Sequence, residues 1–211
     1  MSRKRVFESK KRNSHHLQER PVLLLVAEGK NVTEKNYFSQ YISSNTYYSI
    51  KMINAGNTTD PEGLFKVIEK AWRDLKLETR KNDIAFVVLD LDCDESKAVI
   101  LQKLLNQSNH IRFVISNPCF EIWYLLHFKY STKPYIDNSS VISELRKHLD
   151  GYEKTSDVND CLRCYGARAI ENSERLCRHH TEQGHAWPSN ESNPRTDVHE
   201  LMNMLLKKRA V

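Results

Sequence analysis

The sequence is poor in glycine and lacks the glycine-rich motifs that bind nucleotides. It contains six glycines in 211 residues, and neither G-x-x-x-x-G-K-[ST] nor G-x-G-x-x-G occurs in it. We therefore expect no ATP or dinucleotide binding of the usual glycine-rich kind.

Long apolar segments and an export signal are also missing. No apolar run is longer than Val22–Ala27, far short of the ~20 residues that a membrane-spanning helix needs. The N-terminal Arg and Lys residues are not followed by an apolar stretch with a cleavage site. Five cysteines, an odd number, indicate reduced thiols rather than a disulfide framework. The sequence therefore predicts a cytoplasmic protein without a membrane segment.

Enough apolar material is present for one folded unit. Hydrophobic residues make up 39% of the chain and charged residues 28%, which is typical of a globular protein. At one domain per ~150 residues, the length fits one generous domain, or one domain with a small appendage.

The formal net charge of +5 comes from the first twenty residues. Residues 1–20 contain seven Lys or Arg and two Glu residues, and the remaining chain balances 25 basic against 25 acidic side chains. Residues 1–20 also lack periodic apolar positions, so we predict a disordered basic arm that approaches phosphates by counterion release. A solvated tail without a partner is the alternative, because a basic tail alone identifies no target.

Residues 21–130 alternate apolar runs with segments of helical periodicity, which is typical of a mainly parallel sheet with crossover helices. The pattern predicts strands over 22–26, 48–52, 84–89 and 111–115, and helices over 33–42, 61–75, 99–105 and 120–128. Asp60 and Pro61 fit the N-cap and the first position of the second helix. The predicted fold class is therefore α/β, with helices that flank the sheet.

Residues 131–211 contain fewer apolar residues and no strand-like runs. Helices are predicted over 141–149, 166–180 and 197–208, and the loop over 184–194 contains two prolines. We expect a helical extension packed on the core of residues 21–130. A second small domain is the alternative.

Acidic side chains follow two of the predicted strands. Glu28 comes directly after the first strand, and Asp90, Asp92 and Asp94 follow the third. Ligands of open α/β sheets bind at the carboxyl ends of strands, and residues i and i+2 of an extended segment point the same way. Asp90 and Asp92 could therefore present two carboxylates to one Mg²⁺, with Glu28 nearby as a general acid or base. Alternatively, such acids only cap the next helix, as Asp94 could.

Three further groups of residues have both a structural and a functional interpretation. Ser116 or Asn117 could cap the helix that contains Glu121, or Asn117 and Glu121 could face the metal. Lys154 beside Tyr152 combines a cation and an aromatic ring, as in sites for single-stranded nucleic acid. The third group is a possible zinc site, for which ordinary reduced thiols are the alternative; it consists of Cys161, Cys164 and Cys177 with His179 and His180.

Four segments together carry a resemblance to a known family. They are LLLVAEGKNVTEKNYF (23–38), FVVLDLDCD (86–94), SNPCFEIWYLLHF (116–128) and NPRTDVHEL (193–201). A Glu after the first strand and an Asp-x-Asp after a later strand resemble a TOPRIM domain. The whole set resembles the RloB family, TOPRIM-like proteins of prokaryotic defence loci.

The resemblance implies a nuclease that acts in anti-phage abortive infection. It implies Mg²⁺ or Mn²⁺ held by Asp90 and Asp92 beside Glu28, a phosphodiester substrate in DNA or RNA, and a partner ATPase of the ABC or AAA type. It also implies a TOPRIM-like core over 21–130, and a homo-oligomer is compatible with it. The usual pattern of the glutamate loop is closer to E-G-E-K-T-E. Here Lys30 replaces the second acid, which lowers metal affinity but could receive a phosphate, and the position of Glu34 is shifted.

The replaced acid leaves a second hypothesis open. In a non-catalytic interaction module, the acidic residues would form a docking surface for the ATPase, or the chain would only bind nucleic acid.

Deleting residues 1–20 is expected to leave the thermal stability nearly unchanged, because a segment without an apolar face buries little surface. The deletion removes seven cations, so the salt dependence of nucleic-acid binding is expected to flatten by several units of slope. Binding measured over a range of salt concentrations checks this. An unchanged slope would mean that the arm is only a tail.

Overall fold

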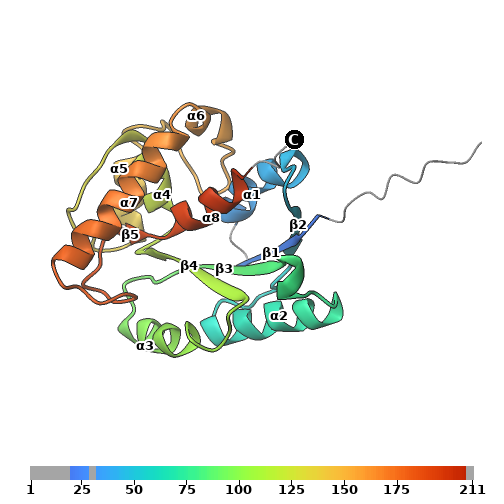
Figure 1. The fold of residues 1–211 in the computed structure, drawn as a ribbon. Helices are drawn as coiled ribbons and strands as arrows, with labels where there is room; N and C mark the ends of the chain where they lie inside the picture. The colour runs from blue at the N-terminus through green and yellow to red at the C-terminus, as the bar shows by residue number, and fades with distance from the viewer. Residues whose placement is uncertain (1–19, 29–31, 208–211) are drawn as a thin grey trace, which may run out of the picture.

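The central element is a five-stranded sheet (Figure 1). The computed structural model describes residues 20–28 and 32–207. The strands are β1 (Val22–Ala27), β2 (Ser49–Ile53), β3 (Ile84–Asp90), β4 (Ile111–Asn117) and β5 (Arg195–Thr196). Their order is β2-β1-β3-β4-β5; the first four are parallel, and β5 runs antiparallel to β4. The predicted α/β fold with a mainly parallel sheet is confirmed.

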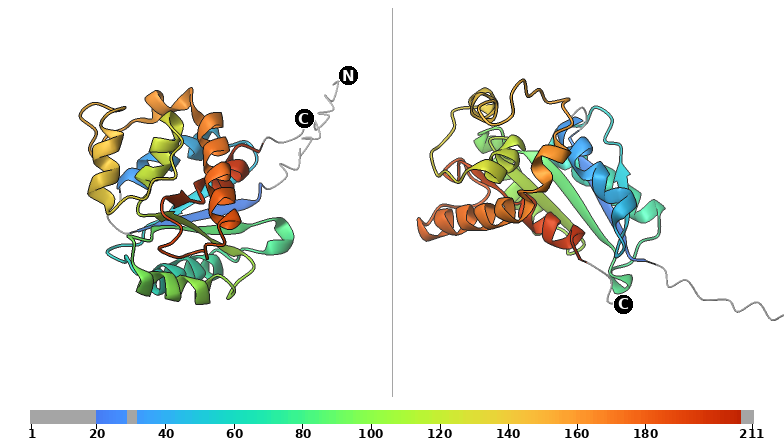
Figure 2. Two further views of the ribbon diagram at one scale, coloured as in Figure 1. Left: turned by 90° about the vertical axis from the view of Figure 1, so that its left-hand side faces the viewer. Right: turned by 90° about the horizontal axis from the view of Figure 1, so that it is seen from above.

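Helices cover both faces of the sheet (Figures 1 and 2). One face packs against α2 (Pro61–Asp74) and α3 (Glu95–Leu104). The other face packs against a larger helical layer made of α1 (Val32–Ser44), α4 (Glu121–Phe128), α5 (Asn138–Leu145), α6 (Asn159–Arg163), α7 (Gly166–Glu182) and α8 (Val198–Leu205). A short 3-10 helix, η1 (Thr79–Lys81), precedes β3.

The two central strands are apolar because both of their faces are buried. Along β1, Leu23 and Leu25 face the larger helical layer, whereas Leu24 and Val26 face α2 and α3. Every residue of β3 is buried. Such strands are expected to be almost continuously apolar, which explains why their sequences stand out. The first polar residues after these runs therefore lie at the edge of the core.

The order of the strands reverses between β1 and β3. The chain passes from β1 to β2 on one side, and then crosses back to place β3 on the other side of β1. This reversal is the point at which open α/β sheets bind ligands, outside the carboxyl ends of the strands. Glu28 and Asp90 are the residues at those two ends.

The C-terminal region shares the core of the larger helical layer. Helix α7 packs on α4, and side chains of α5 to α8 join the same apolar cluster as those of α1. The region also supplies β5, which the pattern did not predict, because two residues are too few to show a period. The pattern also did not predict helix α6, because its five residues are too few to show a helical period. The boundary near residue 130 stays a prediction.

Two expectations concern the ends of the chain and membranes. Residues 1–19 of the predicted basic arm lie outside the described residues, and Arg20 at its end donates from Nη1 to the carbonyl oxygen of Asn45 at 2.8 Å. Within residues 20–28 and 32–207, no helix is long and apolar enough to cross a membrane.

The predicted start of α2 is confirmed, and it gives a stability test. Asp60 Oδ1 accepts a hydrogen bond from the backbone N–H of Gly63 at 2.7 Å, and Pro61 occupies the first helical position. Asp60→Ala is expected to lower the free energy of unfolding by about 1 kcal/mol, measured by urea denaturation. Asp60→Asn should keep the cap and most of the stability. Equal losses in both variants would show that the cap bond is not the cause.

Candidate acidic site

Four acidic side chains lie buried near the carboxyl ends of β1 and β3. We call Glu28, Glu34, Asp90 and Glu121 the acidic cluster. Ala27 pairs with Val88 in the parallel ladder, so Glu28 comes one residue later, beside the end of β3. Glu34 comes from the first turn of α1, and Glu121 is the first residue of α4. No strand separates β1 from β3, as the predicted site requires.

Burial makes the charged forms of these acids unfavourable. The exposed fractions of Glu34, Asp90 and Glu121 are only 1%, 4% and 1%. Burial, aided by the neighbouring carboxylates Glu121 and Glu28, raises the pKa of Glu34 to about 8. Burial, and then the charges of Glu34 and Glu121, raise the pKa of Asp90 well above its usual value. A cation placed among these groups would therefore stabilise their ionised forms.

Part of the acidic cluster has no hydrogen-bonding partner among the described residues. This is true of Asp90 Oδ1 and Glu121 Oε2, both fully buried atoms. The other oxygen of Glu121 accepts a hydrogen bond from the Tyr152 hydroxyl at 3.1 Å and lies 4.0 Å from Lys154 Nζ. Two predicted supporting residues, Glu121 and Lys154, are thus brought together at the cluster.

A lysine that the sequence patterns did not indicate joins Glu28 to Asp92. Lys97 Nζ lies 2.7 Å from Glu28 Oε1 and 3.0 Å from Asp92 Oδ2. Burial alone would lower the pKa of Lys97, but the two carboxylates more than offset this and raise it. Burial raises the pKa of Glu28 even though Lys97 opposes the shift. The only sequence signal for Lys97 is its place five residues after Asp92, in the first turn of α3.

The expected extended geometry of Asp90 and Asp92 is wrong. Strand β3 ends at Asp90, and Asp92 and Cys93 adopt left-handed backbone conformations with φ of 56° and 55°. Asp90 therefore lies in the core, whereas 43% of the Asp92 side chain is exposed. Non-glycine residues rarely take such a conformation, although Asp tolerates it better than most. Asp90 therefore reaches the site from the end of β3 and Asp92 from the turn that follows, rather than both from one face of a strand.

Neighbouring backbone groups hold this turn in place. The N–H of Leu91 donates to the carbonyl oxygen of Ser116 at 2.8 Å, and the N–H of Asp92 donates to that of Pro118 at 2.9 Å. Asp94 caps α3, with its Oδ1 accepting from the backbone N–H groups of Ser96 and Lys97 at 2.8 and 3.3 Å. The capping interpretation of Asp94 is therefore confirmed.

Asn117 supports the turn and does not cap α4. Its Oδ1 accepts from the N–H of Cys93 at 3.3 Å, and its Nδ2 donates to the carbonyl oxygens of Ser189 and Ser192 at 3.3 and 3.1 Å. The N-cap residue of α4 is Phe120, without a side-chain cap bond. The expected cap by Ser116 or Asn117 is thus wrong. The Ser116 side chain contacts Thr196 of β5, and the Asn117 side chain bonds to the turn and to the loop over 184–194.

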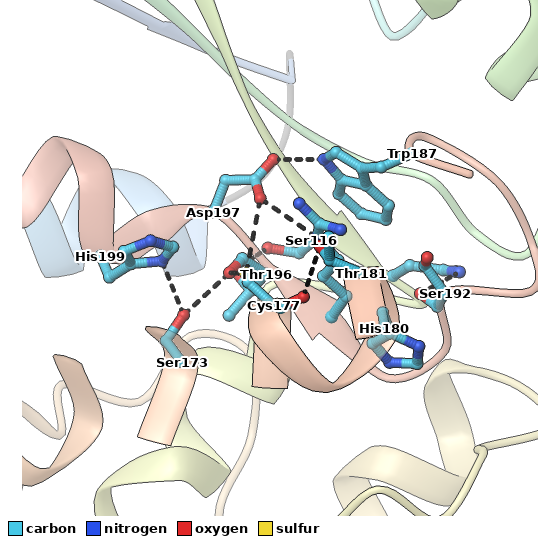
Figure 3. Close-up of polar contacts among 12 residues, drawn as sticks. Ser116, Ser173, Cys177, His180, Thr181, Trp187, Ser192, Thr196, Asp197 and His199 are labelled. Carbon is cyan, nitrogen blue, oxygen red and sulfur yellow. Dashed lines mark hydrogen bonds and ion pairs between the residues drawn. The ribbon is translucent and has the colours of Figure 1, made fainter. Parts of the chain in front are cut away.

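A buried polar network fixes β5 beside β4 (Figure 3). The hydroxyls of Ser116 and Thr196 are 2.7 Å apart. The Ser173 hydroxyl donates to the carbonyl oxygen of Thr196 at 2.8 Å and lies 2.9 Å from His199 Nδ1. Ser173 is fully buried, so this Ser–His pair has a structural role and no access to a substrate.

Asp197 belongs to the same network, beside the indole ring of Trp187 (Figure 3). Its Oδ2 accepts from Trp187 Nε1 at 2.7 Å, and its Oδ1 forms an ion pair with Arg195 at 3.5 Å. Burial raises the pKa of Asp197 to about 7, although Arg195 and Trp187 oppose the shift. These contacts attach the loop over 184–194 to the start of α8.

The remaining predicted residues do not join the acidic cluster. Cys161 and Cys164 are exposed, and Cys177 Sγ lies 3.7 Å from the carbonyl oxygen of Thr196. Within the described ranges, no group of three or more His, Cys, Asp or Glu side chains is arranged to hold a metal ion, so the zinc alternative gains no support. Lys30 lies outside the described residues.

Two buried oxygens of the acidic cluster are nevertheless suited to a hard divalent ion that takes few protein ligands. Mg²⁺ is usually held by one or two carboxylates, several waters and substrate phosphate oxygens. Asp90 Oδ1 and Glu121 Oε2 are buried and have no partner in the described part of the chain, as free ligand oxygens would. In contrast, Glu28 and Asp92 already contact Lys97.

Replacing Glu34 by Gln tests the burial of the cluster. The pKa of Glu34 is about 8 in the folded chain against an ordinary 4.5. The associated stability is therefore fully present below about pH 4.5 and is lost as the pH rises through 8. In EDTA at pH 8.5, Glu34→Gln should raise the melting temperature by several degrees, at about 2–4 °C per kcal/mol, and should have little effect at pH 4.5. Exposed Glu171→Gln is the control. A shift that does not depend on pH would contradict the prediction.

Comparison with known proteins identifies one family. No curated protein and no solved structure matches the chain. A family model described as RloB-like protein matches residues 23–205, a range that includes all four segments that carried the resemblance. Because the match covers most of the chain, the protein belongs to the RloB-like family.

Proposed function

We propose that this protein is a TOPRIM-type nuclease that uses Mg²⁺ or Mn²⁺ to cleave phosphodiesters. One observation carries the proposal: the buried Asp90 carboxylate, with its Oδ1 unpartnered among the described residues, lies among other acids at the switch point of the sheet. A buried polar atom without a partner needs an explanation, and a bound cation supplies one. Family membership supports the same proposal.

Each residue of the site would have a separate role in the reaction. Asp90 would hold the divalent ion with Glu121 close by, and Asp92 would add its negative charge from the turn while paired with Lys97. When bound, the ion would neutralise charge on the phosphodiester and activate a water molecule. Glu28 would accept or donate the proton. Asn117 would keep the turn of Asp92 in position through its bond to Cys93.

Lys154 is suited to contact the substrate. Its ammonium group lies 4.0 Å from Glu121, and its side chain is 44% exposed, so it can reach a phosphate at the edge of the acidic cluster. Lys30, which lies outside the described residues, would act similarly. The nucleic acid, the ATPase partner of the ABC or AAA type and the role in anti-phage abortive infection are proposals that rest on the family resemblance.

Asp90→Asn and Asp92→Asn test the metal site. Each variant keeps the size of the side chain and removes the charge that a hard cation needs. Both should abolish nuclease activity and cell toxicity, measured with the ATPase present. Asp90→Asn should also weaken Mn²⁺ binding in a calorimetric titration. Folding should persist in both variants, and Asp90→Asn should be slightly more stable in metal-free buffer, because neighbouring carboxylates repel each other. Complex formation with the ATPase should survive.

Asp94→Asn is the matched control, since Asn caps a helix as well as Asp does and Asp94 only caps α3. It should leave both activity and Mn²⁺ binding unchanged. Cleavage by the wild type that persists in excess EDTA would defeat the mechanism.

A non-catalytic docking module remains the second candidate, and one observation favours it. Lys97 already neutralises part of the acidic charge, through Glu28 and Asp92, so the folded chain is less dependent on a metal. This candidate predicts that the wild type shows no nuclease activity, and that Asp92→Asn weakens binding to the ATPase.

A further inference from the structure

We propose that Lys97 is a resident cation that takes the place of a second metal ion. The chain would then bind one divalent ion, on the Asp90 side of the site, while the ammonium group serves the Glu28 and Asp92 side. This inference rests on the proposed function, since it assumes that the acidic cluster binds a metal.

The contacts of Lys97 are those of a shared cation. Its Nζ lies 2.7 Å from Glu28 Oε1 and 3.0 Å from Asp92 Oδ2, and only 12% of its side chain is exposed. The two carboxylates come from different segments, one after β1 and one after β3. An ammonium group has three N–H donors, so these two bonds leave a third donor that can reach a water molecule or a phosphate oxygen.

The surroundings hold Lys97 and its partners in position. Asp94 caps α3 and accepts from the backbone N–H of Lys97 itself at 3.3 Å. Asp92 Oδ1 accepts from Asn138 Nδ2 at 2.9 Å, so both of its oxygens are engaged. A cation in the first turn of a helix is unfavourable next to the positive end of the helix dipole. The carboxylates of Glu28 and Asp92 offset this cost.

Among the described residues, no such buried cation lies on the other side of the site. Only 4% of Asp90 is exposed, and its Oδ1 has no hydrogen-bonding partner in the described part of the chain. Glu121 Oε2 is in the same condition. Its nearest cation, Lys154 Nζ, is 4.0 Å from the opposite oxygen of Glu121 and is much more exposed than Lys97. These buried oxygens are an independent indication that a ligand belongs on this side.

A second divalent ion would therefore have to displace Lys97. The displaced ammonium group would lose its two short ion pairs, to Glu28 and to Asp92. We infer a stoichiometry of one metal ion per chain.

Calorimetric titration of the full chain with MnCl₂ tests this stoichiometry. The wild type should bind one ion. Lys97→Met removes the resident charge and should bind two, the second one between Glu28 and Asp92. Lys97→Arg keeps a cation and should still bind one. Lys103→Met, at an exposed position on the same helix α3, is the matched control and should also bind one.

A double variant tests whether the second ion of Lys97→Met lies between Glu28 and Asp92. Lys97→Met with Asp92→Asn removes one positive and one negative charge together, so it should fold even where Lys97→Met alone does not. It should bind one ion, because the released pair has lost a ligand. Circular dichroism in metal-free buffer checks the fold of each variant.

The outcomes separate this inference from the proposed function. One ion in both the wild type and folded Lys97→Met would overturn the role of Lys97 and leave the nuclease proposal intact. Two ions in the wild type would do the same. No Mn²⁺ binding by either protein would overturn the metal site itself, and the role of Lys97 with it.

Discussion

The burial of carboxylates at the end of two apolar strands is the constraint on which the rest of the site depends. β1 and β3 are enclosed by helices on both faces, so the first polar residues beyond them are drawn into the margin of the core. Charge is costly there, and like charges raise the cost further. The fold tolerates Glu34 and Asp90 in this position either as protonated acids or with a cation among them. An arrangement that is unfavourable for stability is common where a protein needs it for chemistry.

Several distant segments cooperate to shape the site. The turn of Asp92 is bonded to the Ser116–Pro118 segment, and Lys97 returns to the same turn from α3. Glu34 and Glu121 lie in the first turns of α1 and α4, two helices of the larger helical layer. The acids are therefore fixed by backbone geometry, and their side chains have little freedom to separate. This rigidity is what a site for a small, hard cation requires.

The parts of this molecule that sequence could predict are those set by short-range patterns. β1 and β3 were evident because burial on both faces demands continuous apolar residues, and α2 was evident from the cap of Asp60. The acids beyond β1 and β3 followed from the rule that parallel strands end at one edge. What could not be predicted depends on contacts between distant residues. Neither the bond of Lys97 to Glu28 nor the role of Asn117 leaves a local signal.

The turn of Asp92 illustrates the limit most clearly. The D-x-D spacing of Asp90 and Asp92 suggests an extended segment, but Asp92 and Cys93 have left-handed backbone conformations. The N–H groups of this turn donate to oxygens of Ser116, Pro118 and Asn117. Glu34 was similarly hard to assign from its spacing, since Lys30 and Val32 alter the usual loop pattern. Its place in the acidic cluster depends on how α1 packs against α4, and no single segment encodes that packing.

The turn that contains Asp92 and Cys93 is bonded to the loop over 184–194, and this affects when the site can form during synthesis of the chain. Asn190 Nδ2 donates to the carbonyl oxygen of Cys93 at 2.7 Å, and Asn193 Nδ2 lies 3.3 Å from Cys93 Sγ. Chains fold from the N-terminus as they leave the ribosome, so β1 to β4 emerge well before these asparagines. The turn that presents Asp92 cannot be fully secured until residues 190–193 have been translated. An unfinished or truncated copy would therefore carry the acids without the geometry that makes them a site.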